Sequence, residues 1–301
     1  MLALVAGVAP AQEVPAAGAL SPVPVAVAAG DSVARRAAID SSLLGRSGKL
    51  RARLVSAGRL LPLRYLTELF GDSSAHRPGI YTLPDSGALR LSFINLLPFD
   101  QKQAGRIDGY RMGFWPGERR APRSGAYANP DGFIRVTPEN QDTRVSEHFR
   151  LRDFLTHDQQ DVWPKYLVLR EELVDKLELI IDDLNARGVR VRHMTVMSGF
   201  RTPQYNQRGV GSGGRARDSR HQFGDAADVF VDNDGDGRMD DLNGDRRVDQ
   251  RDAQILIDAA ERVEAAHPDL VGGAGRYRAN RAHGPFAHID VRGRRARWGN
   301  S

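Results

Sequence analysis

The chain has 301 residues, of which 41% are hydrophobic and 27% charged, so it is long enough for one large or two small globular domains. It contains no cysteine, which excludes a disulfide framework, a thiolate zinc site and a cysteine nucleophile. The 43 basic and 38 acidic residues give a net charge of +5, but the basic residues form no block and no aromatic-interleaved motif. Nucleic acid is therefore not the expected partner, whereas an anionic polymer suits the mild positive balance.

Residues 1–34 are predicted to be a signal-like segment followed by a flexible tether. The apolar run from Leu2 to Val8 precedes Ala9-Pro10-Ala11, which matches the apolar region and cleavage site of a secretory signal peptide. The first basic residue is Arg35, so the positive start of such a signal is missing, and an Ala/Pro/Val-rich tail is the alternative. We favour export, to the periplasm or outside the cell. No stretch reaches the roughly 20 apolar residues of a membrane span, so no transmembrane segment is expected.

Residues 35–145 are predicted to hold a helical lead and a β-rich accessory module. The helical piece lies within residues 41–70 and is expected to break at Pro62. Between Tyr81 and Val136, short alternating segments are separated by Gly, Pro and Asn turns, which is typical of strands. Tyr110 and Trp115 in this module are expected to be buried rather than exposed to a glycan.

Residues 146–301 are predicted to form the functional domain, which begins with a long helix and a strand. The helix is expected to end near Gly188, and the strand at 190–197 is expected to deliver Arg201 to a cleft. The apolar positions that fall on one helix face, and therefore belong to the core, are Leu169, Leu173, Leu177, Ile180, Ile181 and Leu184.

Three short motifs in this domain predict a zinc site, namely S-G-F-R at 198–201, H-Q-F-G-D-A-A-D at 221–228 and H-I-D at 288–290. Catalytic zinc takes three protein ligands and keeps a fourth position open for water, and His221, Asp228 and His288 supply three. Asp228 is expected at the start of a strand, because a β-branched and aromatic run follows it. Phe286, His288 and Asp290 are expected to share the strand face that looks into the site.

A second metal site is predicted in residues 232–252, an insertion between the zinc motifs. Its aspartates have the spacing of two overlapping calcium loops, which share residues and cannot form two independent EF-hands. We expect one Ca²⁺ site, or two that share ligands; a solvated acidic loop is the alternative. The second loop resembles those of dockerin modules, although Arg246 stands where glycine is usual. The candidate ligands are Asp232, Asp234, Asp236, Asp240, Asp241, Asn243, Asp245, Asp249 and Asp252.

The three zinc motifs resemble those of the zinc D-Ala-D-Ala carboxypeptidase family of bacterial cell-wall peptidases, whose fold is shared by the Hedgehog signalling domain and the lysostaphin-type endopeptidases. The resemblance covers residues from about His148 to Trp298. It implies an α+β fold with a small antiparallel sheet, flanking helices and a zinc groove. It further implies that Arg201 contacts the carboxylate or scissile carbonyl of the substrate, that Ser219 binds substrate, and that the activity is hydrolysis of peptidoglycan stem peptides by a D,D-carboxypeptidase or endopeptidase.

The general base is where the chain departs from part of that family. Many relatives carry glutamate three residues before the last histidine ligand, and Pro285 stands there instead. His283 is the favoured base, because the ordinary histidine pKa of about 6.5 suits proton transfer near neutrality. Asp290 is the other candidate, but it is expected to orient His288 instead.

Two other functions stay open from the sequence. One is a noncatalytic, metal-stabilised cell-wall binding module of the same fold, as the Hedgehog resemblance suggests. The other is a calcium-dependent adhesion or scaffold protein, in which the acidic insertion is the functional part. Oligomeric state and the particular peptide bond are not readable from the residues.

Overall fold

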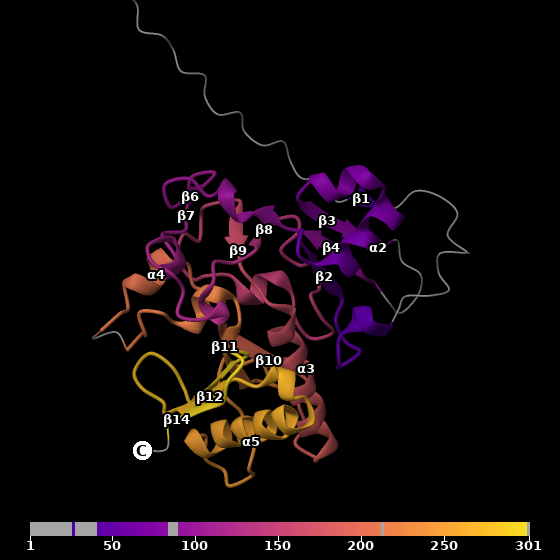
Figure 1. Ribbon diagram of the computed structural model, residues 1–301. Helices are drawn as coiled ribbons and strands as arrows, with labels where there is room; N and C mark the ends of the chain where they lie inside the picture. The colour runs from indigo at the N-terminus through magenta and orange to yellow at the C-terminus, as the bar shows by residue number, and fades with distance from the viewer. Residues whose placement is uncertain (1–25, 28–40, 84–89, 212–213, 300–301) are drawn as a thin grey trace, which may run out of the picture.

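The structure is a computed structural model that describes residues 26–27, 41–83, 90–211 and 214–299. These residues form four sheets and belong to the α+β class at a coarse level (Figure 1). The predicted signal-like segment lies outside the described residues. Of the predicted tether, Ala26–Val27 forms strand β1 and the rest also lies outside them.

The largest sheet carries the predicted zinc motifs. Its order is β10-β11-β13-β12-β14, and its neighbours are antiparallel except for the parallel pair β12 and β14. The sheet is therefore mixed, whereas the sequence resemblance implied an antiparallel one. The strand predicted at 190–197 begins only at residue 194. The strands are β10 (Met194–Ser198), β11 (Ala226–Val231), β12 (Gly273–Tyr277), β13 (Phe286–Asp290) and β14 (Ala296–Trp298).

Helices α3 (Glu171–Ala186) and α5 (Gln250–Ala266) pack against each other, and α5 also packs against β12 and β13 (Figure 1). The predicted apolar face is confirmed, because all six of its positions are buried, five of them in α3 and Leu169 just before the helix. Burying each Leu or Ile contributes roughly 1.5–3 kcal/mol, so these positions stabilise the hydrophobic core that α3 shares with the strands of the sheet. Asp249 caps α5, since its side chain accepts a hydrogen bond from the N–H of Arg251.

The N-terminal region forms a separate small core around helix α2 (Leu60–Phe70). The prediction that a helix breaks at Pro62 is wrong, because Pro62 is the third residue of α2. Amide groups in the first turn of a helix have no partner four residues earlier, so proline removes no hydrogen bond there. The sheet has the order β1-β3-β4-β2, with β2 (Ala52–Val55), β3 (Gly79–Thr82) and β4 (Ser92–Asn95), and the core contains Leu43, Val55, Leu66, Tyr81, Leu91 and Phe93.

The middle of the chain links this region to the large sheet. The predicted burial of Tyr110 and Trp115 is confirmed, since both are fully buried. The Trp115 indole N–H donates to the carbonyl of Gln222, inside the second zinc motif, at 2.7 Å. The strands are β5 (Leu97–Pro98), β8 (Gly132–Val136) and β9 (Lys165–Leu167) in one sheet and β6 (Arg106–Ile107) and β7 (Tyr110–Arg111) in another.

The domain boundary proposed at residue 145 stays a prediction, but two features cross it. Strand β8 lies before the boundary and pairs with β9 after it. One continuous hydrophobic cluster also extends from Leu50 to Val291.

The remaining helices are α4 (Pro203–Gln207) and the 3-10 turns η1 (Ser41–Leu44), η2 (Asp72–His76), η3 (Phe99–Gln101), η4 (Pro116–Glu118), η5 (Gly125–Tyr127), η6 (Leu151–Phe154), η7 (Arg220–Phe223) and η8 (Pro268–Leu270). No helix of the described residues is long and apolar enough to cross a membrane.

Candidate metal centre

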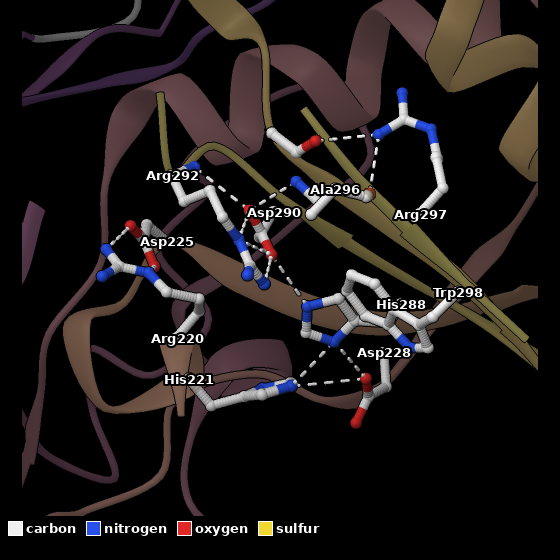
Figure 2. A network of polar contacts seen from close by, with 12 residues as sticks. Arg220, His221, Asp225, Asp228, His288, Asp290, Arg292, Ala296, Arg297 and Trp298 are labelled. Atoms are coloured by element: carbon white, nitrogen blue, oxygen red, sulfur yellow. Dashed lines mark hydrogen bonds and ion pairs between the residues drawn. The ribbon is translucent and has the colours of Figure 1, made fainter. Parts of the chain in front are cut away.

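The three predicted zinc ligands come together on the large sheet. Asp228 in β11 is paired in register with His288 in β13, and His221 comes from η7, the 3-10 turn that precedes β11 (Figure 2). Asp228 is the third residue of its strand, close to the predicted strand start. The turn into β11 needs Gly224, whose φ is +66° and where a Cβ would lie 2.4 Å from the carbonyl oxygen of Val168. The motif thus combines two ligands with the glycine that brings them together.

Hydrogen bonds fix the tautomers of both histidines. His221 Nδ1 donates to the carbonyl of Gly199 at 2.7 Å, and His288 Nε2 donates to Asp290 Oδ2 at 3.1 Å. Neither acceptor carries a proton to give, so the lone pairs belong to His221 Nε2 and His288 Nδ1. These two atoms face each other, as Figure 2 shows. Such outer partners orient ligand histidines in zinc sites.

The distances between the three donor atoms fit zinc. His288 Nδ1 lies 2.9 Å from Asp228 Oδ1, His221 Nε2 lies 3.3 Å from the same oxygen, and the two nitrogens are 3.2 Å apart. Zinc bonds of about 2.0–2.1 Å give about 3.3 Å between neighbouring ligands of a tetrahedron. Two lone pairs and a carboxylate oxygen repel each other at these separations unless a proton or a metal ion lies between them. The donor set therefore suits a zinc ion, and all three side chains are buried.

The charges of the centre shift its pKa values strongly. Burial alone would raise the pKa of Asp228, but His221 and His288 hold it well below its usual range. Burial would lower the pKa of His288, but hydrogen bonds to Asp228 and Asp290 raise it to about 9. A metal ion must therefore displace a proton from His288 at neutral pH.

Arg201 contacts the candidate ligand Asp228. Its Nη2 donates to Asp228 Oδ2 at 2.5 Å, and its Nε donates to Ser198 Oγ at 2.9 Å. These bonds turn the other oxygen of Asp228 toward the histidines. The described residues offer no acceptor to Nη1, and Arg201 lines the cavity in front of the centre, as does Ser219. Arg201 thus contacts both a candidate ligand and the space where a substrate would lie.

His283 lies in the turn before β13 and lines the same cavity. Its Nδ1 donates to the carbonyl of Gly284 at 2.8 Å, which leaves the lone pair on Nε2. The Nδ2 group of Asn280 donates to that Nε2 at 2.8 Å, while Asn280 Oδ1 accepts from the backbone of Ala282 and His283. To accept a proton from water, His283 Nε2 must break its hydrogen bond with Asn280 and form one with the water molecule instead.

Asp290 lies behind His288 and does not line the cavity. Its carboxylate accepts from His288, from both Arg292 Nε and Nη2, and from the Gly273 N–H at 2.7 Å. Although burial opposes it, these partners hold the pKa of Asp290 far below its usual range. Of the two candidate bases, His283 is at the cavity, and Asp290 is placed to orient a ligand.

The cavity has a volume of about 850 Å³ and contains two aromatic residues that the sequence analysis did not single out. Tyr277 and Trp298 form part of an aromatic wall, while Arg215 and Arg217 lie on the loop before His221. The two arginines occur close to the motif, which is a usable sequence signal. No local pattern marks Trp298, because it reaches the site only through the pairing of β14 with β12.

The acidic insertion contains two turns with the same hydrogen-bond pattern. The structure brings together the carboxylates of Asp232, Asp234 and Asp240, and no other carboxylate group of the insertion in the described residues converges in this way. Asp252 accepts hydrogen bonds from the backbone N–H groups of Leu242, Asn243 and Asp249. Its oxygens therefore tie the loop to the N-terminus of α5. In the repeated pattern, Asp232 accepts from the N–H of Gly235 and Gly237, and Asp241 accepts from Gly244 and Arg246.

Arg246 adopts the backbone conformation for which glycine is usual in a calcium loop. Its φ is +65°, compared with +79° at the equivalent Gly237. A left-handed conformation costs a residue with a Cβ roughly 1–2 kcal/mol. The second turn therefore has the backbone conformation of a calcium loop even though Arg246, and not glycine, occupies position six.

Comparison of the chain with protein-family models, with curated proteins and with solved structures finds no match. A functional proposal therefore rests on the geometry of the site and on the motifs themselves.

Proposed function

We propose that this protein is a zinc metallopeptidase that hydrolyses peptide bonds in peptidoglycan stem peptides, as a D,D-carboxypeptidase or an endopeptidase in the periplasm or outside the cell. The observation that carries the proposal is the convergence of three buried donor atoms with fixed tautomers at the base of a large cavity. The three zinc motifs of the family are present together, and their residues occupy one site.

The roles of the chain's own residues follow from their contacts. A zinc ion held by His221, Asp228 and His288 would supply a Lewis acid and would lower the pKa of a water molecule to about 7. His283 Nε2 takes a proton from the attacking water and returns it to the leaving amine nitrogen. The water oxygen adds to the carbonyl carbon, the C–N bond breaks, and an acid and an amine result. Arg201 binds a substrate oxygen through the N–H groups that its bonds to Asp228 and Ser198 do not use.

The charge of the cavity favours a substrate with carboxylates, as stem peptides have. Arg215 and Arg217 form no ion pair within the described residues, so both can meet an anionic group. A guanidinium binds a carboxylate with two parallel hydrogen bonds. The cavity is lined by Arg123, Arg201, Arg215, Arg217, Arg220 and Arg292 against Asp218 and Asp228.

The test is hydrolysis of purified peptidoglycan by the zinc-loaded protein, followed by mass spectrometry of the products. Release of free D-alanine would identify a carboxypeptidase, and conversion of cross-linked dimers into monomers would identify an endopeptidase. A chelator should stop either reaction, and added zinc should restore it. If the zinc-loaded protein binds peptidoglycan but leaves every peptide bond intact, the noncatalytic binding module replaces the peptidase.

We also propose that the insertion at 232–252 binds Ca²⁺ as a structural ion. The grouping of Asp232, Asp234 and Asp240 and the repeated turn support this proposal. Eight aspartates against four arginines in this segment repel one another without a cation. Asp232 directly follows β11, so an ion there stabilises the end of the strand that carries Asp228.

A further inference from the structure

One wall of the cavity is aromatic and extends from β14 to the turn that carries His283. Trp298, Tyr277, Phe286 and His283 all line the cavity. The rings of Tyr277 and Phe286 are stacked, with centroids 4.5 Å apart and planes 5° apart. His283 meets the same phenylalanine edge-on at 4.8 Å. Phe286 therefore packs against both Tyr277 and His283, the proposed general base.

The Tyr277 hydroxyl is oriented by Trp298. The Trp298 Nε1–H donates to Tyr277 Oη at 2.9 Å. An indole nitrogen is a donor only, so the tyrosine oxygen must be the acceptor and its own proton points elsewhere. The described residues offer that proton no acceptor. The hydroxyl is therefore a donor held ready for a group that is not part of the chain.

The position of Trp298 depends on Gly275. The two residues are register partners in β14 and β12, and a Cβ on Gly275 would lie 2.2 Å from the indole. With glycine there, the indole lies across the sheet beside His288, at 5.1 Å between ring centroids (Figure 2). Trp298 thus contacts a candidate zinc ligand and positions the Tyr277 hydroxyl at the same time.

The electrostatics keep Tyr277 protonated. Burial raises the pKa of Tyr277 above its ordinary value of about 10, so the phenol is neutral at pH 7. The charges of Asp228 and Arg201 also act on this hydroxyl, in opposite directions. Tyr277, Asp228 and Arg201 line the same cavity, so the tyrosine hydroxyl and the metal centre face one space.

We infer that Tyr277 is a further catalytic residue, whose hydroxyl donates a hydrogen bond to the substrate carbonyl oxygen as that oxygen gains negative charge, and that Trp298 is its positioning residue. This inference rests on the proposed peptidase function. The tyrosine proton stays on its own oxygen throughout, so the proton balance of the hydrolysis is unchanged. A donor fixed in advance toward a developing charge stabilises the transition state more than the bound substrate.

The test compares the zinc-loaded wild type with Tyr277→Phe on purified muropeptides, with Tyr65→Phe in α2 as the matched control. We expect kcat of Tyr277→Phe to fall about 10²- to 10³-fold, as for loss of one oxyanion donor, with KM, zinc content and Tm unchanged. A phosphinate analogue of the cleaved bond, which mimics the tetrahedral transition state, should bind Tyr277→Phe more weakly by a similar factor in calorimetry. Tyr65→Phe should behave like the wild type.

Trp298→Phe keeps an aromatic ring but removes the indole N–H. We expect kcat to fall about 2- to 10-fold, the usual worth of one net hydrogen bond, with zinc content unchanged. The double variant Tyr277→Phe/Trp298→Phe should be no slower than Tyr277→Phe alone, because Trp298 acts through the hydroxyl. Additive losses in the double variant would overturn the positioning role.

The outcomes separate this inference from the proposed function. If the wild type hydrolyses muropeptides and Tyr277→Phe does so equally fast, only the role of Tyr277 is wrong. If the wild type holds zinc but hydrolyses no muropeptide, the peptidase proposal is wrong, and the role of Tyr277 is wrong with it.

Discussion

The two candidate metal sites differ in how the chain builds them. The zinc centre takes its ligands from η7, β11 and β13, with His221 and His288 67 positions apart in the chain, and buries all three. The acidic insertion places every candidate ligand within residues 232–252, and several of these side chains are exposed. A site made from distant segments is oriented by the packed sheet before metal arrives. A site made from one local segment depends on the cation to hold its like charges together.

The strongest test of this difference is removal of a zinc ligand. His288→Ala should lose stoichiometric zinc and all hydrolysis, because two ligands cannot hold the ion in a tetrahedral site. Asp290→Asn, which alters only the outer partner of His288, should weaken zinc binding about 10- to 100-fold. Elemental analysis at low free zinc measures both. Stoichiometric zinc in folded His288→Ala would show that the ligand set is wrong.

Loss of the proposed general base should leave the metal in place. His283→Ala is expected to lower kcat about 10²- to 10⁴-fold, because proton transfer from water loses its acceptor. Zinc content and Tm should stay at the wild-type values, since His283 contacts no candidate ligand in the described residues. Steady-state kinetics and elemental analysis measure the two quantities. Wild-type turnover in His283→Ala would eliminate His283 as the base.

The two sites should also respond differently to acid. With the pKa of His288 at about 9 in the metal-free protein, protons compete with zinc, and each fall of one pH unit below that value should weaken zinc binding about tenfold or more. The insertion offers only oxygen ligands, and calcium displaces no proton from a histidine there, so calcium binding should depend much less on pH between pH 7 and pH 5 than zinc binding does. Titration calorimetry at both pH values measures this. Equal pH dependence of the two ions would contradict the assigned donor sets.

Arg201 connects the zinc centre to the substrate, and its planar shape matters for both contacts. Arg201→Lys keeps the charge but cannot hold Ser198 and Asp228 while binding a substrate oxygen. Loss of one charge-assisted hydrogen bond corresponds to roughly 10- to 100-fold in kcat/KM. Zinc content should remain at one per chain. A lysine variant with full activity would mean that Arg201 only holds Asp228.

The smallest expected effect concerns calcium. Millimolar Ca²⁺ should raise Tm by a few degrees in the zinc-loaded protein, because the ion binds only the folded loop. Asp232→Asn should remove this shift while zinc content stays unchanged. Differential scanning calorimetry with Ca²⁺ or with a calcium-selective chelator measures it. Identical melting curves in the two conditions would leave only a solvated acidic loop.

Local patterns in the sequence determined much of the fold. The apolar face predicted for the long helix and the burial of Trp115 follow from side chains a few residues apart, and the structure confirms them. The face predicted for β13 is confirmed only in part, because Phe286 and His288 line the cavity whereas Asp290 does not. Pro62 shows the limit of such rules, since its effect depends on whether it lies in the first turn or in the interior of the helix. The zinc motifs likewise identify His221, Asp228 and His288 as candidate ligands by residue type and spacing alone.

Only the tertiary structure decided how those residues are oriented and what surrounds them. The register of β11 with β13 brings Asp228 opposite His288, and the carbonyl of Gly199 selects the tautomer of His221. Trp298 reaches the site through the parallel pairing of β14 with β12, which no nearby residue predicts. The physical reason is that sequence periodicity records which face a side chain takes, whereas hydrogen bonds between distant strands determine which faces meet.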